Sequence, residues 1–247
     1  MKSFIIILMI FICSSASAKE FETKDNFTLL IPDNWLEIPP YVLREAEAYA
    51  LKISNGKTVL KYDYGFQLSS AFNWLEYPYI FVQINRDRRI APREMKDQLQ
   101  LQDDFNKGIE HVKKNSAETL SNIAKDEFRY DESSNTLWSS YSMHVTNIGQ
   151  IKGVTGMKLT QFGFIQVNGY AKEEEFEKYA PVFRSLVNDM LIDEEYKYSP
   201  KFTDNIPTIF GVDLTKIAVG AVLGAIFTLI ARFLQKPKKT ETSEDLS

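Results

Sequence analysis

Apolar residues recur at helical spacing in three stretches of the chain. Residues 41–53 and residues 92–114 each carry one apolar stripe, and Pro92 opens the second helix. The third stretch ends near residue 190, and we expect a kink or a fresh start at Pro181 inside it. The apolar positions are Val42, Ala46, Tyr49, Ala50 and Ile53; Met95, Leu99, Phe105, Ile109 and Val112; and Phe176, Tyr179, Phe183, Leu186, Val187 and Met190.

Alternating apolar and polar residues predict strands between these helices. Residues 27–31 form a short apolar strand, and residues 58–68 and 79–85 alternate so that each buries one face. Further extended segments are residues 127–131, 136–145 and 157–167. Because β-α-β alternation is absent, the pattern predicts an α+β domain, with one antiparallel β-sheet covered by helices. The expected inward residues are Leu60, Tyr62, Tyr64, Phe66 and Leu68, and Ile80, Val82 and Ile84.

The first 18 residues have the pattern of a secretory signal peptide. Lys2 precedes an apolar run that ends at Cys13, and small residues with an Ala-x-Ala ending follow. We expect cleavage after Ala18. Cys13 is the only cysteine, and the bulky Ile12 before it argues against a lipoprotein site. The mature chain would then contain no thiol, which favours a bacterial envelope.

A second apolar segment, residues 214–234, has the length of a transmembrane helix. Residues 217–231 carry no charge, and as a helix the segment would span about 31 Å, close to the hydrocarbon thickness of a bilayer. Four basic residues follow the apolar run, so we expect the tail to stay in the cytoplasm. These residues are Arg232, Lys236, Lys238 and Lys239.

These two ends predict five parts and a location. The parts are a signal peptide (1–18), an extracytoplasmic α+β domain (19–205), a linker (206–213), a transmembrane helix (214–234) and a cytoplasmic tail (235–247). Residues 19–213 contain 23 basic and 30 acidic residues, a net charge of −7, which argues against nucleic-acid binding. The expected location is the bacterial inner membrane, crossed once, with the N-terminal domain in the periplasm.

Gly220 and Gly224 form a Gly-x-x-x-Gly pair within the predicted transmembrane helix. Small residues four apart let two helix backbones approach closely, so this pair is a candidate face for self-association as a homodimer. Glycine is also common in membrane helices, and the sequence leaves both interpretations open.

The outer domain opens at residues 27–35 with Phe-Thr-Leu-Leu-Ile-Pro-Asp-Asn-Trp, a short strand followed by a proline turn and a tryptophan. This opening, together with the ending of the domain, resembles the PsbP/Mog1/DcrB-like domains. The resemblance implies an α/β/α sandwich, mostly without enzymatic activity, that serves as an accessory or binding module. It implies no catalytic residue, and the C-terminal membrane helix is a departure from the usual forms. The residues that resemble the family's ending are Gly163, Phe164, Gly169, Tyr170, Ala171, Phe183, Leu186 and Val187.

Few residues point to catalysis. The two histidines are His111, beside the apolar stripe of the second helix, and His144, on the outward register of a strand. No His-Glu-x-x-His spacing, P-loop, Gly-x-Ser-x-Gly elbow or glycine-rich dinucleotide turn is present, so we expect no metal, cofactor or catalytic residue. A dispersed Ser-Asp-His site around His144 stays open as an alternative.

Two features are candidate binding sites. Arg86, Arg88, Arg89 and Arg93 cluster before the second helix, where arginine forks and free helix N–H groups suit a phosphate or carboxylate. The sequence favours the simpler interpretation, a solvated loop whose arginines pair with neighbouring acids. The second feature is an aromatic connection that, if exposed, would bind a partner and, if folded back, would cover the sheet edge. Its members are Phe72, Trp74, Tyr77 and Tyr79.

The sequence therefore favours a membrane-anchored extracytoplasmic binding or scaffolding protein without catalytic activity. Its expected partners are the membrane, through the C-terminal helix, and a second copy or another envelope protein. The alternatives are an envelope hydrolase around His144 and a structural subunit of a membrane complex.

Overall fold

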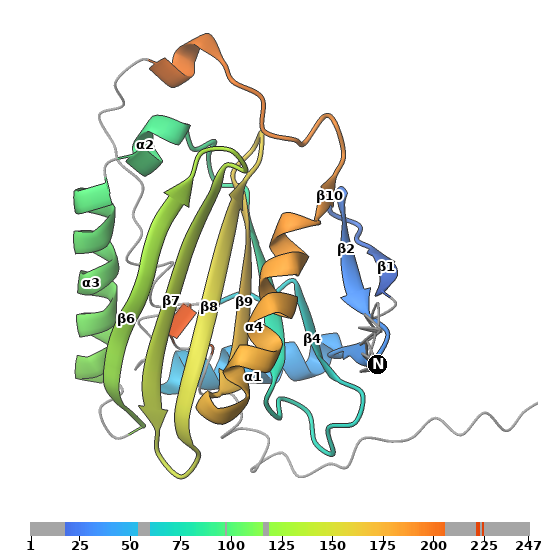
Figure 1. Cartoon of the computed structure of the whole chain (residues 1–247), viewed down its shortest axis with the longest axis vertical. Helices are drawn as coiled ribbons and strands as arrows, with labels where there is room; N and C mark the ends of the chain where they lie inside the picture. Colours follow the sequence, from blue (N-terminus) through green and yellow to red (C-terminus); the bar gives the residue numbers. More distant parts are fainter. Residues whose placement is uncertain are drawn as a thin grey trace, which may run out of the picture.

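A seven-stranded antiparallel sheet forms the middle layer of the domain (Figure 1). The computed structural model describes residues 18–53, 60–96, 98–115, 119–205, 221–222 and 224. The strands lie in the order β3 (Trp35–Glu37), β4 (Tyr64–Leu68), β5 (Tyr79–Asn85), β9 (Phe164–Lys172), β8 (Gly149–Leu159), β7 (Thr136–Val145) and β6 (Leu120–Asp131).

Helices cover both faces of this sheet. On one face α4 (Glu173–Asn188) packs with a small sheet of β1 (Ala18–Glu22), β2 (Phe27–Pro32) and β10 (Leu191–Ile192). On the other face α1 (Pro40–Ile53) and α3 (Gln98–Asn115) share a second apolar cluster. The short α2 (Pro92–Lys96) and the 3₁₀ helix η1 (Phe202–Asn205) lie near one end of the sheet (Figure 1). The expected α+β arrangement, with antiparallel strands between helices, is confirmed.

Burial on both faces corrects one detail of the strand prediction. Tyr64 and Phe66 pack on the α4 side, whereas Leu60 and Tyr62 pack with α1 and α3. These residues therefore do not share one face, because β4 begins only at Tyr64 and the chain before it lies outside the sheet.

Turns and helix ends also differ from the prediction. Residues 157–167 are two strands, because Thr160 N–H bonds the Gly163 carbonyl and turns the chain from β8 into β9. A Cβ on Gly163 would lie 2.0 Å from the Asn85 carbonyl oxygen, so this turn requires glycine. The α4 helix continues through Pro181 without a fresh start, and in the second helical stretch the described helices are Pro92–Lys96 and Gln98–Asn115.

The two predicted membrane-targeting segments lie largely outside the described residues. Residues 1–17 are not described, and Ala18 already belongs to β1. Within residues 206–247, only Ala221, Val222 and Gly224 are described, so the predicted linker and tail are outside the described part. Among the described residues, no helix is both long enough and apolar enough to cross a membrane.

Replacement of Gly169 by alanine should destabilise the fold. An added Cβ would lie 2.2 Å from the Phe183 ring of α4, and we expect this overpacking to lower the free energy of unfolding by about 2–3 kcal/mol. The matched control is Gly149→Ala, whose Cβ meets nothing within 4 Å but whose φ of +111° is unfavourable for alanine, at about 1 kcal/mol. Urea unfolding measures both, and an equal loss would contradict close packing of α4 on Gly169.

Candidate functional site

Three tyrosines form a row across the face of the sheet that carries α1 and α3. Tyr79 on β5 lies opposite Tyr170 on β9, which lies opposite Gly153 on β8, which in turn lies opposite Tyr141 on β7. A Cβ on Gly153 would lie 2.5 Å from Cε2 of Tyr141, so glycine leaves the space that the Tyr141 ring fills. All three side chains are buried. We call Tyr79, Tyr141 and Tyr170 the tyrosine row.

The hydroxyls of the tyrosine row hold a segment from the far end of the chain. Tyr141 and Tyr170 both donate to the Ala221 carbonyl, at 2.7 and 2.6 Å, and Tyr79 donates to the Gly224 carbonyl at 3.0 Å. Ala221, Val222 and Gly224 are helical, and the first two belong to the apolar cluster of α1 and α3. The row therefore recognises the backbone of an apolar helical segment, and two hydroxyls use both lone pairs of one carbonyl.

Gly224 fits this contact because it has no side chain. A Cβ at this position would lie 2.1 Å from the Tyr170 hydroxyl oxygen, far inside van der Waals contact. Any larger residue would push the segment off the tyrosine row. Small side chains likewise let the backbone of Ala221 come within hydrogen-bond distance of two tyrosine rings.

Burial keeps these hydroxyls protonated. Loss of solvent raises the pKa of Tyr141 and of Tyr170 well above the ordinary value of 10.0, and the neighbouring Tyr141 adds to the effect at Tyr170. Both residues are therefore hydrogen-bond donors at every physiological pH. This suits them to bind carbonyl oxygens, which only accept.

A second row, of polar side chains, lies next to the tyrosine row on the same face. Asn168 accepts from Thr155 Oγ1 and from Gln166 Nε2, both at 2.8 Å, and donates to Gln83 at 3.2 Å. Asn168, Thr155 and Gln166 are buried. These side chains hydrogen-bond one another and so tie together the strands that carry the tyrosine row. They are not placed to bind a ligand.

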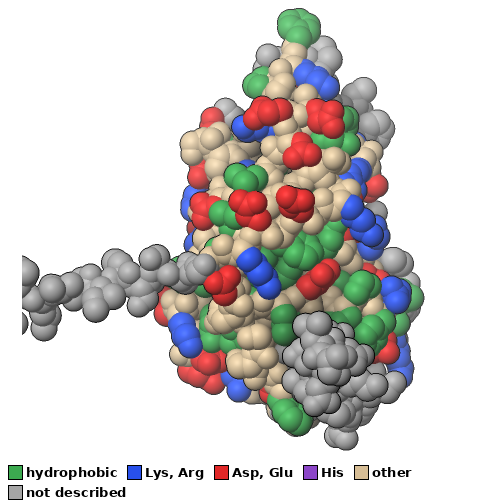
Figure 2. Space-filling view, turned by 90° about the vertical axis from the view of Figure 1, so that its right-hand side faces the viewer, with side chains coloured by type: hydrophobic (Ala, Val, Ile, Leu, Met, Phe, Trp, Pro, Cys, Tyr) green, Lys and Arg blue, Asp and Glu red, His purple; other side chains and the backbone are tan. Residues whose placement is uncertain are grey.

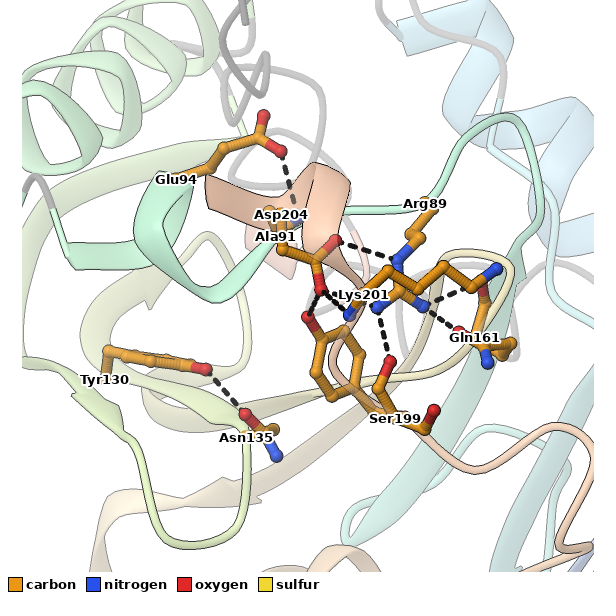
Figure 3. A network of polar contacts seen from close by, with 10 residues as sticks. Arg89, Ala91, Glu94, Tyr130, Asn135, Gln161, Ser199, Lys201 and Asp204 are labelled. Atoms are coloured by element: carbon orange, nitrogen blue, oxygen red, sulfur yellow. Dashed lines mark hydrogen bonds and ion pairs between the residues drawn. The ribbon is translucent and has the colours of Figure 1, made fainter. Parts of the chain in front are cut away.

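A polar network fastens η1 and the segment before it to the end of the sheet (Figure 3). Arg89 Nε and Nη2 donate to the Asp204 carboxylate at 3.1 and 2.8 Å, and the Tyr198 hydroxyl donates to it at 2.6 Å. The Arg89 guanidinium also contacts Gln161 and donates to the Ser199 carbonyl at 2.6 Å. Hydrogen bonds from Arg89 and then Tyr198 hold the pKa of Asp204 well below its ordinary value, despite desolvation.

The arginine cluster is divided among separate acidic partners. Arg86 pairs with Asp25 at 2.8 Å, Arg88 with Glu94 at 2.9 Å, and Arg89 with Asp204 at 2.8 Å. Arg93 Nη2 is buried and has no hydrogen-bond partner in the part of the chain that the structure describes. The structure thus places three of the four arginines in ion pairs.

Figure 2, which shows the side of α4 and the small sheet, has acidic and basic side chains interspersed.

The aromatic connection does not form one exposed patch. Tyr77 and Tyr79 are buried, with their rings stacked at a centroid distance of 4.9 Å, and Trp74 packs partly buried against the same cluster. Phe72 alone of the four is largely exposed, at 72%. Of the two arrangements considered for this connection, Tyr77 and Tyr79 adopt the one in which the aromatic rings fold back onto the sheet. Tyr79 belongs to the buried tyrosine row and not to an exposed surface.

The region of His144 shows no catalytic arrangement in the described residues. His144 is half-buried on β7, opposite Ser121 and Gln150, and none of the described residues hydrogen-bonds its imidazole. No group of three or more His, Cys, Asp or Glu within the described ranges is placed to hold a metal ion.

A shallow hollow near Asp25 and Arg86 encloses about 10 Å³, enough for one water molecule.

Sequence reasoning missed the tyrosine row as a site. The predicted inward strand positions did not include Tyr141, and Tyr170 entered only through the family-like ending. The missing information was register, because Tyr79, Tyr170 and Tyr141 become neighbours only when β5, β9, β8 and β7 pair. The available signal in the sequence was Gly153 itself, because a glycine within a strand often marks the close approach of another group.

Comparison with solved structures finds similar chains at low identity. Cyanobacterial PsbP (CyanoP) from Synechocystis is 13% identical, covers 73% of this chain and 95% of its own, and has a TM-score of 0.45. The Ran-binding protein Mog1p of Saccharomyces cerevisiae is 9% identical, with coverages of 72% and 96% and a TM-score of 0.41. LpqN of Mycobacterium tuberculosis, described as involved in cell envelope biogenesis, is 12% identical, with coverages of 73% and 87% and a TM-score of 0.34.

The structures found include a PsbP and a Mog1p, the proteins that give the resembled domains their name. Identities of 9–13% and TM-scores below 0.5 transfer no function to this chain. No model of a protein family matches the sequence, and no curated protein matches it.

Replacement of Asp204 by asparagine should destabilise the chain in a pH-dependent way. At pH 7 we expect a loss of about 2 kcal/mol in the free energy of unfolding, because charged hydrogen bonds to Arg89 are replaced by neutral ones. The pKa of Asp204 is lower in the folded than in the unfolded state, so its ionised form stabilises the fold above the ordinary pKa of 3.8. This stabilisation is lost as the pH falls below that value.

The difference in stability between the variant and the wild type should therefore begin to shrink below about pH 4, the region of the unfolded carboxyl's pKa, and should vanish as the pH falls through the much lower pKa of the folded carboxyl. Denaturant unfolding across the pH range measures the difference, and Asp33→Asn, at an exposed turn position, is the control. A difference that stays constant down to pH 2 would contradict the ion pair as its source.

Proposed function

We propose that this chain is a non-catalytic binding or scaffolding protein of the bacterial envelope. Its folded domain, residues 19–205, lies outside the cytoplasmic membrane, and its binding surface is the tyrosine row. The ligand is an apolar helix that presents small residues and its backbone carbonyls to the three hydroxyls. One observation carries this proposal: three buried tyrosines on adjacent strands all donate to the backbone of a helical segment.

Hydrogen bonds to backbone carbonyls select a bound helix by its shape and not by its side-chain chemistry. A hydroxyl that bonds a carbonyl is indifferent to the side chain of that residue, but close approach requires glycine or alanine at the contact, as at Gly224 and Ala221. The surrounding cluster, which includes Phe105 and Ile109 of α3 and Val42 of α1, buries apolar side chains of the bound helix. An apolar helix with small residues on one side satisfies both requirements.

The membrane tether rests on the sequence. The signal-peptide pattern of residues 1–18 and the apolar segment 214–234 with its basic flank support an exported domain and a cytoplasmic tail. A domain held next to the membrane is close to apolar helices of two kinds. They belong to other membrane proteins or to a second copy of this chain. Self-association through Gly220 and Gly224 is the homodimeric form of this proposal, and Gly220 lies outside the described residues.

Two other functions remain as alternatives. A structural subunit of a membrane complex would use the same tyrosine row to hold a neighbouring subunit's helix. A hydrolase around His144 would need a nucleophile and an acid beside that imidazole, and the described contacts of β7 support neither.

Peptide binding tests the proposed surface. We expect a fluorescent peptide with the sequence of residues 214–234, flanked by solubilising lysines, to bind the chain truncated after residue 213. The double variant Tyr141→Phe and Tyr170→Phe should bind about tenfold more weakly, because two hydrogen bonds to one carbonyl are lost. Tyr130→Phe, whose hydroxyl bonds Asn135 instead, is the matched control. Equal affinity of the double variant and the control would refute the proposed surface.

Protease accessibility tests the tether and its orientation. With an epitope tag after Ser247, protease added to intact bacterial spheroplasts should digest the domain of residues 19–205 and leave a short tagged fragment protected. The reverse pattern, with the domain protected and the tag lost, would overturn the proposed location.

A further inference from the structure

Strand β1 forms an edge of the small sheet. Figure 1 shows it on the outer side of that sheet, with no labelled element beyond it. Within the described ranges β1 pairs with β2 alone, and four of its five residues are exposed. An edge strand carries backbone N–H and C=O groups that can pair with another chain. A further strand can therefore add to the small sheet beside β1.

The hairpin between β1 and β2 determines which backbone groups point to this edge. Thr23 N–H donates to the Phe27 carbonyl at 3.1 Å, so these two residues form a hydrogen-bonded pair at the end of the hairpin. Hydrogen-bonded and non-hydrogen-bonded pairs alternate along antiparallel strands, and the register places Glu20 and Glu22 in non-hydrogen-bonded pairs. Pro32 of β2 falls in such a pair too, which agrees with its lack of an N–H group. The N–H and C=O groups of the two glutamates therefore point away from β2.

The side chains of β1 alternate between the core and the solvent. The centroid of the Phe21 ring lies 5.7 Å from that of Tyr64 and 5.0 Å from that of Phe66. Because successive side chains of a strand point to opposite faces, Glu20 and Glu22 share the solvent face, and both are exposed. The same two residues thus supply both the free backbone groups and the negative charge of this edge.

The two glutamates disfavour one occupant of the edge, a second copy of β1. In an added antiparallel strand, the residues with outward backbone groups lie opposite one another. Two copies of β1 would then place Glu20 opposite either Glu20 or Glu22 of the other copy, and like charges directly opposite each other destabilise the pair. A strand with Lys or Arg at these positions would be stabilised by the same geometry.

We propose that β1 binds a basic extended segment of another protein, which adds to the small sheet as an antiparallel strand. Two Lys or Arg side chains of the segment, two positions apart, lie opposite Glu20 and Glu22, and the residue between them lies beside Phe21. The backbone hydrogen bonds give affinity, and the charges select the partner.

The acidic character of the domain adds to this selection, because the excess of acidic over basic residues in 19–213 attracts a basic segment from a distance. The edge of β1 is separate from the tyrosine row. The inference therefore goes beyond the proposed function and does not depend on it.

The probe is the synthetic peptide acetyl-Thr-Lys-Val-Lys-Thr-amide, added at millimolar concentration to the mature chain of residues 19–247 in detergent. Hydrogen exchange followed by NMR reads single amides. The N–H groups of Glu20 and Glu22 should exchange fast in the free chain and about tenfold more slowly with the peptide. The N–H of Phe21, which points to β2, should exchange slowly in both cases. The same peptide with Glu in place of Lys is the control and should have no effect.

Backbone methylation distinguishes an added strand from simple attraction between charges. N-methylation of both lysines of the peptide removes the donors that face Glu20 and Glu22, and we expect it to weaken binding about tenfold. N-methylation of the valine is the matched control, because its N–H points away from β1. This second peptide should bind like the unmodified one.

Two double variants test the charges. Glu20→Lys with Glu22→Lys should reverse the preference, so that the glutamate peptide binds and the lysine peptide does not. Glu174→Lys with Glu177→Lys, at exposed positions of α4, changes the net charge equally and should keep the preference for the lysine peptide. Urea unfolding checks that both variants are folded.

Each contrary result overturns the inference. If the two N-methylated peptides bind alike, charge alone holds the peptide and no strand is added. If the lysine peptide leaves exchange at Glu20 and Glu22 unchanged, the glutamates only protect the edge from self-pairing. If the two double variants share one preference, the peptide is attracted to the acidic domain as a whole. None of these results bears on the tyrosine row, whose own peptide experiment reports the proposed function separately.

Discussion

A buried hydroxyl that can donate requires an acceptor, and this requirement organises one face of the domain. Tyr79, Tyr141 and Tyr170 lie inside the protein with their hydroxyls on one side of the sheet, and a hydroxyl left without a partner would cost about 1–3 kcal/mol. The carbonyls of Ala221 and Gly224 meet this requirement. The proposed helix-binding surface consists of these three hydroxyl donors.

The rest of the fold positions these three residues. The antiparallel pairing of β5, β9, β8 and β7 sets the register that aligns them, and Gly153 opens the space between Tyr170 and Tyr141. The neighbouring polar row ties the same strands together through Asn168. On the opposite face α4 packs closely on Gly169 and buttresses the sheet, while the Arg89–Asp204 ion pair holds the chain that leaves the domain at η1.

The sequence predicts the elements of this fold better than its site. Helical spacing located α1, α3 and α4, and alternation gave β7 with its observed bounds, because those signals are local. The single face predicted for residues 60–68 was wrong for Leu60 and Tyr62, since β4 begins only at Tyr64 and these two residues lie before it. The four arginines are close together in sequence, yet two of their ion partners, Asp25 and Asp204, lie far from them along the chain. Tyr79 and Gly224, which are joined by a hydrogen bond, lie more than 140 residues apart in the sequence. A local sequence pattern cannot predict such a contact.

Backbone recognition by the tyrosine row is the central physical claim, and the vibration of one carbonyl tests it most directly. A chain with a ¹³C=¹⁸O label at Ala221 isolates that amide I band from the rest of the spectrum. Two hydroxyl donors should shift the band to lower frequency than in an ordinary helix, and Tyr141→Phe with Tyr170→Phe should return it. An Ala221 band at the ordinary helical position in the wild type, unchanged by the two substitutions, would contradict the claim.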